Sequence, residues 1–155
     1  MEEQLLGIDL IVVPHLVAHD AAEVDLIRRR SPMQVLPANG ASEAFDLGTF
    51  SDRENLAQAL VLRLLTPRGS LASLGHTAYG SRLHELIGRR KTKALRNLCR
   101  AYVLEVVAQE PRVEDSAVSL VFEPDAETSS SFVFTLEVQP CSGGESLGLS
   151  LEVGL

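Results

Sequence analysis

A carboxylate, a proline and a guanidinium follow one another at Glu110, Pro111 and Arg112. Proline fixes its own φ angle, so this pair of opposite charges projects from a rigid turn. Such a pair can lock the turn, or it can form charged hydrogen bonds with a partner protein. Hydrolysis of a glycosidic bond would need a second carboxylate across a cleft. Glu105 is the only other acid in the helix predicted just before this turn. The motif therefore predicts one of these two roles, a locked turn or a contact with a partner, rather than catalysis.

A second candidate is the cluster of basic residues between positions 82 and 100, in which Glu85 is the only acid. Its members are Arg82, Arg89, Arg90, Lys91, Lys93, Arg96 and Arg100. Basic groups can bind phosphates and give sequence-independent affinity for nucleic acids. However, no aromatic side chains are interleaved with them, and the whole protein is acidic, with a net charge of -7. We expect a solvated helix face or a patch that meets an acidic protein partner. The alternative is a phosphate- or nucleic-acid-binding module that uses segment 82–100.

The other candidates for chemistry are weaker. His15 and His19 have a spacing that can hold a metal ion on a helix, but Pro14 and the strand pattern around it argue against a helix there. Gly143 and Gly144 are not followed by a helix and a lysine, as a phosphate-binding loop requires. No nucleophile elbow is present. We therefore expect no metal, no cofactor and no enzymatic activity.

The composition predicts one domain that does not cross a membrane. The chain has 155 residues, of which 45% are apolar, and this is enough for a sizeable buried core. No apolar run approaches the ~20 residues that a membrane-spanning helix needs. The two cysteines, Cys99 and Cys141, are too few for a disulfide scaffold, and Cys99 falls at a predicted helical core position. A reducing, cytoplasmic compartment fits this usage.

Charge is distributed unevenly along the chain. Residues 1–52 contain nine acids and three basic residues, and residues 53–112 contain eleven basic residues and four acids. Residues 113–155 contain eight acids and no Lys or Arg. This pattern predicts either a charged surface for a partner or a basic middle that folds against its own acidic ends.

The first third of the sequence predicts short strands and a long connector. Residues 5–13 are rich in β-branched side chains and end at Pro14, as expected of a strand. Residues 24–27 suggest a partner strand. Residues 31–50 are rich in proline and glycine and predict a connector with at most one short strand around residues 44–47.

The rest of the sequence predicts helices followed by strands. A capping box from Ser51 to Glu54 begins a helix that continues to Leu65. A short helix is expected over residues 81–87, and a third begins after Thr92 and ends before the proline at position 111. Apolar side chains then alternate with polar or small ones in three segments, at residues 118–122, 132–139 and 147–154. We predict an α+β fold in which about three helices pack on an antiparallel sheet with a C-terminal three-stranded meander. Residues 1–50 would form an N-terminal arm and residues 51–155 the core of one domain.

Several short blocks of this sequence resemble those of one known family. They occur in order at residues 55–69, at Gly75-His76, at residues 79–88 and at residues 110–113. Their order and spacing are similar to those of the baseplate wedge, or sheath-initiator, family of contractile injection systems, which is often labelled lysozyme-like. The resemblance covers roughly residues 45–155. The turn residues of these blocks are Thr66, Pro67, Gly69, Tyr79, Gly80 and Ser81.

This resemblance implies an assembly role. Six copies would surround the tail tube at the baseplate, contact the wedge proteins, the sheath protein and the tube or hub, and template the first sheath ring. The protein would be cytoplasmic during assembly and then part of the baseplate. The family's interaction site with the wedge core corresponds to Glu110, Pro111 and Arg112. The family label also leaves a muramidase as a further alternative.

The resemblance also implies that strands of the sheath protein add to the β-sheet of this protein. A sheet edge can accept an extra strand through main-chain hydrogen bonds, and the last three strands carry no lysine to guard such an edge. We expect the docking edge near residues 132–139 or near residues 147–153. The apolar residues of these two strands are Phe132, Phe134, Leu136, Leu147, Leu149 and Leu151.

Overall fold

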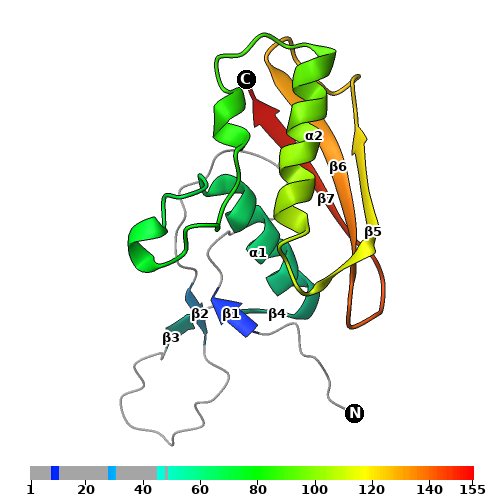
Figure 1. The fold of residues 1–155 in the computed structure, drawn as a ribbon. Helices are drawn as coiled ribbons and strands as arrows, with labels where there is room; N and C mark the ends of the chain where they lie inside the picture. Colours follow the sequence, from blue (N-terminus) through cyan, green and yellow to red (C-terminus); the bar gives the residue numbers. More distant parts are fainter. Residues whose placement is uncertain (1–7, 11–27, 31–44, 48) are drawn as a thin grey trace, which may run out of the picture.

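Helices precede a C-terminal sheet in the computed structural model, which describes residues 8–10, 28–30, 45–47 and 49–155 (Figure 1). The elements are β1 (Ile8–Leu10), β2 (Arg28–Arg30), β3 (Phe45–Leu47), β4 (Thr49–Ser51), α1 (Asp52–Leu65), the 3-10 helices η1 (Ala72–Leu74) and η2 (Leu83–Leu86), α2 (Lys93–Val107), β5 (Val113–Phe122), β6 (Ser131–Pro140) and β7 (Leu147–Gly154). The predicted α+β class is confirmed.

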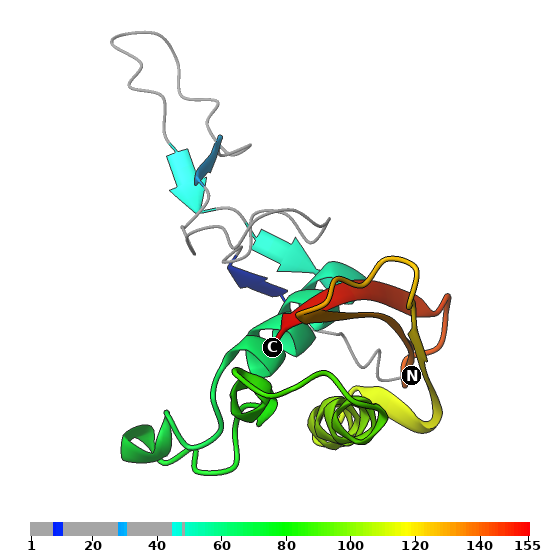
Figure 2. The same ribbon diagram turned by 90° about the horizontal axis from the view of Figure 1, so that it is seen from above.

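The sheet of β5, β6 and β7 has one face on the core. Its strands are antiparallel and lie in the order β5-β6-β7. Alternate side chains of β6 are fully buried, among them Phe132, Phe134 and Leu136. Both α1 and α2 pack against this buried face (Figure 2). The alternation read from the sequence is therefore the alternation between a core face and a solvent face.

Helix α2 forms because its apolar residues recur at helical spacing. The Thr92 Oγ1 atom accepts a hydrogen bond from the Leu95 N–H at 3.1 Å and so caps the first turn. The apolar side chains of this helix are buried at Leu95, Cys99, Tyr102, Val103, Val106 and Val107, and Leu98 is partly buried. Cys99 is fully buried, and this burial raises the pKa of its thiol to about 12. The thiol is thus a core group, as expected.

The predicted short helix over residues 81–87 differs from the structure. The segment forms a single 3-10 turn, η2, and a second 3-10 turn, η1, precedes it. Gly88 follows with a φ of +77°, which an α-helix cannot contain. In the part of the chain that the structure describes, the sheet is thus packed against two α-helices rather than three.

The N-terminal strands form two antiparallel pairs within the described residues. The predicted strand at residues 5–13 is present as β1, but β1 pairs with β4. The predicted partner at residues 24–27 lies outside the described residues, as do His15 and His19. Strand β3 matches the short strand expected around residues 44–47 and pairs with β2. The division into an arm over residues 1–50 and a core over residues 51–155 stays a prediction.

Candidate interaction site

The end of α1 is joined to the segment before η2 by a short parallel bridge between Pro67 and Ser81. The Ser81 N–H donates to the Thr66 carbonyl at 2.8 Å, and the Arg68 N–H donates to the Ser81 carbonyl at 2.8 Å. The buried Ser81 hydroxyl donates to the Leu64 carbonyl at 2.6 Å and so satisfies one of the last carbonyls of the helix. We call this arrangement the Pro67–Ser81 joint.

The six predicted turn residues lie together around this joint. Gly80 has a φ of +102°, and a Cβ atom on it would lie 2.4 Å from the Thr66 carbonyl oxygen. Gly69 also has a positive φ, of +85°, at the turn after Pro67. Tyr79 lies beneath the guanidinium of Arg63, whose Cζ atom is 4.8 Å from the ring centroid. The sequence blocks at residues 55–69 and 79–88 thus supply the two segments that form this joint.

The side chain of Glu110 points into the protein and is only 3% exposed. Its Oε1 atom accepts from the Arg112 Nε–H at 2.6 Å, and its Oε2 atom lies 3.7 Å from Nη2 of Arg63 in α1. Burial by itself would raise the pKa of Glu110. The hydrogen bond from Arg112 and the charges of Arg112 and Arg63 outweigh this effect and lower the pKa from its ordinary value.

This geometry separates the three residues of the motif. Glu110 ties α1 to the turn between α2 and β5, as expected of a residue that locks the turn. Pro111 is exposed, and Arg112 is partly exposed beside Cys141, whose N–H donates to the Arg112 carbonyl at 2.8 Å. The surface that a partner can reach at this turn is therefore formed by Pro111 and Arg112, not by the carboxylate.

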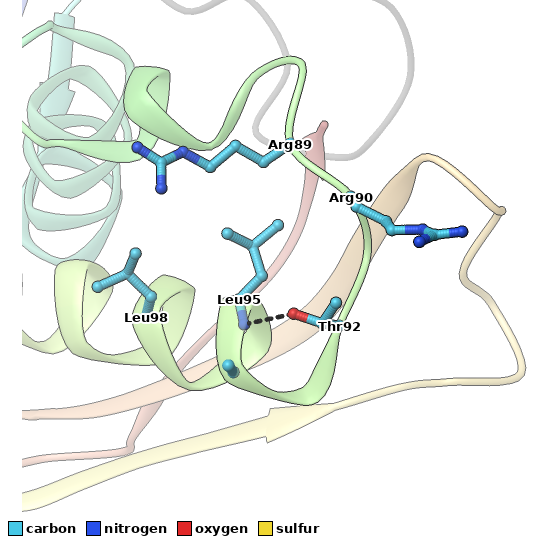
Figure 3. A pocket seen from close by; sticks show the side chains of 6 residues that line it. Arg89, Arg90, Thr92, Leu95 and Leu98 are labelled. Carbon is cyan, nitrogen blue, oxygen red and sulfur yellow. Dashed lines mark hydrogen bonds between the residues drawn. The ribbon is translucent and has the colours of Figure 1, made fainter.

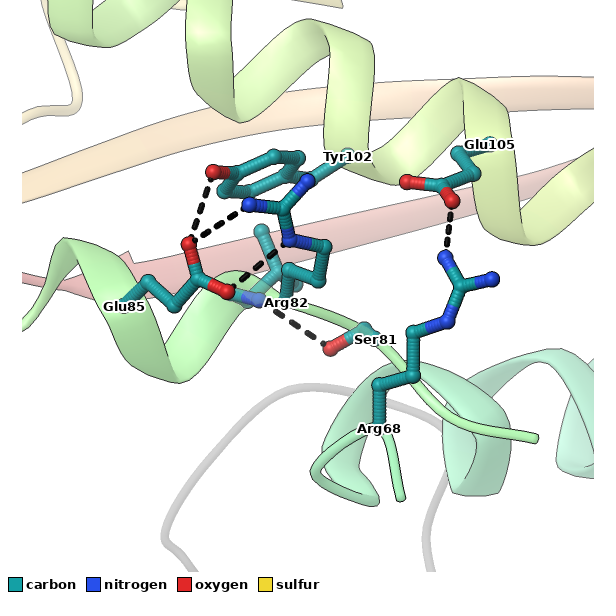
Figure 4. A network of polar contacts seen from close by, with 7 residues as sticks. Arg68, Ser81, Arg82, Glu85, Tyr102 and Glu105 are labelled. Atoms are coloured by element: carbon teal, nitrogen blue, oxygen red, sulfur yellow. Dashed lines mark hydrogen bonds and ion pairs between the residues drawn. The ribbon is translucent and has the colours of Figure 1, made fainter. Parts of the chain in front are cut away.

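A second polar network joins η2 to α2. Figure 4 shows the Glu85 carboxylate hydrogen-bonded to both Arg82 and Tyr102. The carboxylate accepts from the Arg82 Nε–H at 2.9 Å and from the Tyr102 hydroxyl at 2.9 Å. In the same view Arg68, from the joint, is paired with Glu105 of α2. These contacts hold the loop region between the two helices against α2.

The Glu85 network predicts a loss of stability in acid. The hydrogen bonds from Arg82 and then Tyr102 lower the pKa of Glu85 from its ordinary value of 4.5 to about 2. A carboxyl with a depressed folded-state pKa stabilises the fold above its unfolded pKa and loses that contribution as the pH falls toward the folded value. We expect the urea midpoint to fall between pH 4.5 and about 2, and to fall less steeply in Glu85→Gln. An identical pH profile in that variant would contradict this assignment.

Most of the basic cluster is bound within the protein. Lys91 and Arg96 both pair with Glu127, whose side chain is 2% exposed. Arg100 donates to the Leu120 carbonyl at 2.9 Å. A part of the basic middle thus folds against the acidic last third, one of the two explanations for the charge pattern. The side chains of three members form no hydrogen bond or ion pair with any residue that the structure describes: Arg89, Arg90 and Lys93.

These free cations do not converge on an anion site. An open groove of about 500 Å³ at the start of α2 is lined by Arg89, Arg90, Thr92, Ala94, Leu95 and Leu98. Figure 3 shows the side chains of Arg89 and Arg90 extending in opposite directions. The Thr92 hydroxyl oxygen is already used as the helix cap. No feature of the groove therefore favours phosphate binding. Within the described residues, no group of three or more potential metal ligands is found, and no helix is long and apolar enough to cross a membrane.

The predicted docking strands occupy different places in the sheet. Strand β6 is hydrogen-bonded to β5 on one side and to β7 on the other, so it has no free edge. The expectation that residues 132–139 could form the docking edge is therefore wrong, because the middle strand of a meander has both sides paired. The six apolar residues expected to mark the docking strands also face inward, so a partner would contact the main chain.

Strand β7 is an edge strand, and its register shows which groups face outward. The Leu155 N–H donates to the Ser130 carbonyl at 2.7 Å, in the same register as the β6–β7 pairing. Hydrogen-bonded pairs alternate in an antiparallel ladder. The main-chain groups of Gly148, Ser150, Glu152 and Gly154 therefore point away from β6. Among the described strands, β7 pairs with β6 alone.

Sequence reasoning did not identify Arg63 and Glu127, and it gave Arg100 only as a member of the basic cluster. These three residues each bind a group at least 20 positions away in the sequence. Each had only its charge as a signal, and no spacing rule connects charges over such separations.

The fold is similar to a known structure. No family model matches the chain, and no curated protein matches it. Among solved structures, it is similar to a protein from Geobacter sulfurreducens described as a "putative tail lysozyme". The two are 20% identical, with 66% of this chain and 89% of the other covered, and the TM-score is 0.55. At this identity the similarity shows a common fold.

Proposed function

We propose that this protein is a structural component of the baseplate of a contractile injection system. It links the wedge core to the tail and templates the first sheath ring by accepting strands of the sheath protein. The observation that carries this proposal is the unguarded edge of β7. The sequence blocks around the Pro67–Ser81 joint and the fold shared with a protein described as a tail lysozyme support it.

The edge of β7 is suited to main-chain docking. Its eight residues pair with β6 in one continuous register, without a bulge. It contains no lysine and no proline, and Glu152 is its only charged residue. Natural sheets usually guard such an edge with charges, prolines or bulges. An edge with no proline, no bulge and a single charged residue is available for strand addition.

The start of β7 is held in place by α1. Arg53 in the first turn of α1 pairs with Glu145 at 3.1 Å and also donates to the Ser146 carbonyl. These contacts fix the loop that precedes the strand. A pre-formed edge favours docking because little of it must be ordered when the partner binds.

The two faces of the sheet define the strand that would fit there. On the core side, Leu151, Val153 and Leu155 are only partly buried, so apolar side chains of an added strand would complete their burial. On the other side, Ser150 and Glu152 are exposed. The partner segment would therefore alternate apolar residues with polar or basic ones.

The wedge core would contact Pro111 and Arg112, the accessible part of the motif. Six copies around the tube would then present six β7 edges to the first ring of sheath subunits. The proposed role is not enzymatic. A glycosidase needs a general acid with a raised pKa, whereas the pKa of Glu110 is lowered and its carboxylate is bound to two arginines.

The test is a proline on the outward side of the β7 ladder. In Ser150→Pro, the lost N–H points away from β6, so the intramolecular ladder stays intact and an edge strand tolerates the ring. We expect the variant to fold and to enter baseplates, but to nucleate no sheath in electron micrographs of assembled particles.

The matched control is Ser150→Thr, which keeps the N–H and should assemble sheath normally. A second variant, Glu152→Pro, removes the next outward N–H and should fail in the same way. Normal sheath in both folded proline variants would overturn the proposed docking edge.

A further inference from the structure

The sheet has a second edge, along β5, and its main-chain groups can be assigned in the same way. The Glu123 N–H donates to the Val133 carbonyl at 2.8 Å, in register with the β5–β6 pairing. By the alternation of the antiparallel ladder, Val121 bonds to β6. The main-chain groups of Leu120 and Phe122 therefore point away from the sheet, where an added strand would bind.

Side chains of helix α2 occupy the place beside β5 where an added strand would bind. The Arg100 Nη1–H donates to the outward carbonyl of Leu120 at 2.9 Å. The same guanidinium lies over the Phe122 ring, 5.4 Å from its centroid, and Arg96 lies over that ring at 5.3 Å. Arg96 is itself held by its ion pair with Glu127. Two arginines one helical turn apart thus cover the C-terminal end of the β5 edge.

The N-terminal half of β5, from Val113 to Val118, is irregular. The pairing with β6 shifts in register between Val113 and Val118, whereas β7 pairs without interruption. Bulges and charged side chains are the devices that keep sheet edges from pairing with other chains. In the described residues, β5 has a register shift and two arginines over its edge, whereas β7 has no bulge and only one charged residue, Glu152.

We propose that Arg100 closes the β5 edge, so that strand addition is confined to β7. The basic cluster of α2 then has a role in the fold that needs no anionic ligand: it makes the sheet one-sided. The restriction to β7 rests on the proposed function, but the closure of β5 is a property of the isolated protein. A protein that seeds an ordered ring needs this property, because a second open edge would join copies at random.

The test measures self-association in a background where β7 is blocked. In Ser150→Pro, only the β5 edge remains for pairing between copies. Adding Arg100→Met removes the hydrogen-bond donor but keeps an apolar stem of similar length. We expect the double variant to self-associate at least about tenfold more tightly than Ser150→Pro alone in sedimentation equilibrium.

The control is Ser150→Pro with Arg90→Met, which removes the same charge from an exposed arginine without an ion pair and should sediment like the background. Arg100→Lys keeps a donor and a charge and should restore most of the closure. If the folded Arg100→Met double variant associates no more tightly than the Arg90→Met control, the proposal is wrong. This result is independent of sheath nucleation, which tests the β7 edge separately.

Discussion

Gly80→Ala should unfold at a much lower urea concentration than the wild-type protein, with a loss in the free energy of unfolding of roughly 3 kcal/mol. The new Cβ atom would lie 2.4 Å from the Thr66 carbonyl oxygen and 3.0 Å from the Arg68 nitrogen. Both are main-chain atoms, so no side chain can rotate away. To relieve the clash, the two chain segments of the Pro67–Ser81 joint must separate, and the two hydrogen bonds of 2.8 Å between them must break.

The matched control is Gly69→Ala in the same joint. Gly69 also has a positive φ, of +85°, but its added Cβ would meet nothing within 4 Å. Its substitution should cost only the backbone strain of about 1 kcal/mol. Equal losses in the two variants would mean that strain alone, and not the close approach at Thr66, makes glycine necessary at position 80.

Glu110→Gln should lower the free energy of unfolding by about 3 kcal/mol at neutral pH. The carboxylate is 3% exposed and bound to Arg112 at 2.6 Å and to Arg63 at 3.7 Å. A neutral amide of the same shape keeps the packing but removes the carboxylate charge that Arg63 and Arg112 bind. The variant would therefore loosen α1 from the turn before β5, and urea unfolding should detect this directly.

Glu54→Gln provides the control for the loss of one carboxylate. Glu54 is exposed on α1, so its change should stay within about 0.5 kcal/mol. If Glu110→Gln is equally mild and instead releases the protein from the baseplate, Glu110 would be a direct contact of the wedge core. The fold-locking role described here would then be wrong.

The regular elements were predictable because side-chain period is a local property. The stripe from Leu95 to Val107 has the helical spacing of α2, and the alternation in β6 and β7 is that of a half-buried sheet. The central position of β6 also follows from the predicted meander, since the middle of three consecutive strands has two neighbours. The open choice between residues 132–139 and 147–153 could therefore have been resolved from the sequence.

Other features depend on contacts that no local pattern encodes. Hydrogen bonds in the 3-10 turn η2 join residues three positions apart, whereas those of an α-helix join residues four positions apart. In the sequence, the glycine at position 88 was the main sign of this shorter turn. The pairing of β1 with β4 joins segments about 40 residues apart. The inward direction of Glu110 depends on Arg63, which is 47 positions earlier in the chain. For this reason the motif was found, but the orientation of its carboxylate was not.

The Pro67–Ser81 joint has a consequence for how this fold tolerates change. Because the two ends of residues 68–80 are bonded to each other, the segment between them leaves the core and returns to the same place. Ala72–Leu74 buries no side chain, and Leu74 at its tip is 71% exposed. Lengthening a loop whose ends are already fixed adds only slowly to its closure entropy, by about 0.6 kcal/mol per doubling. Insertions and deletions within residues 68–80 should therefore leave the helices undisturbed. A tag inserted in this segment can locate the protein in an assembled particle.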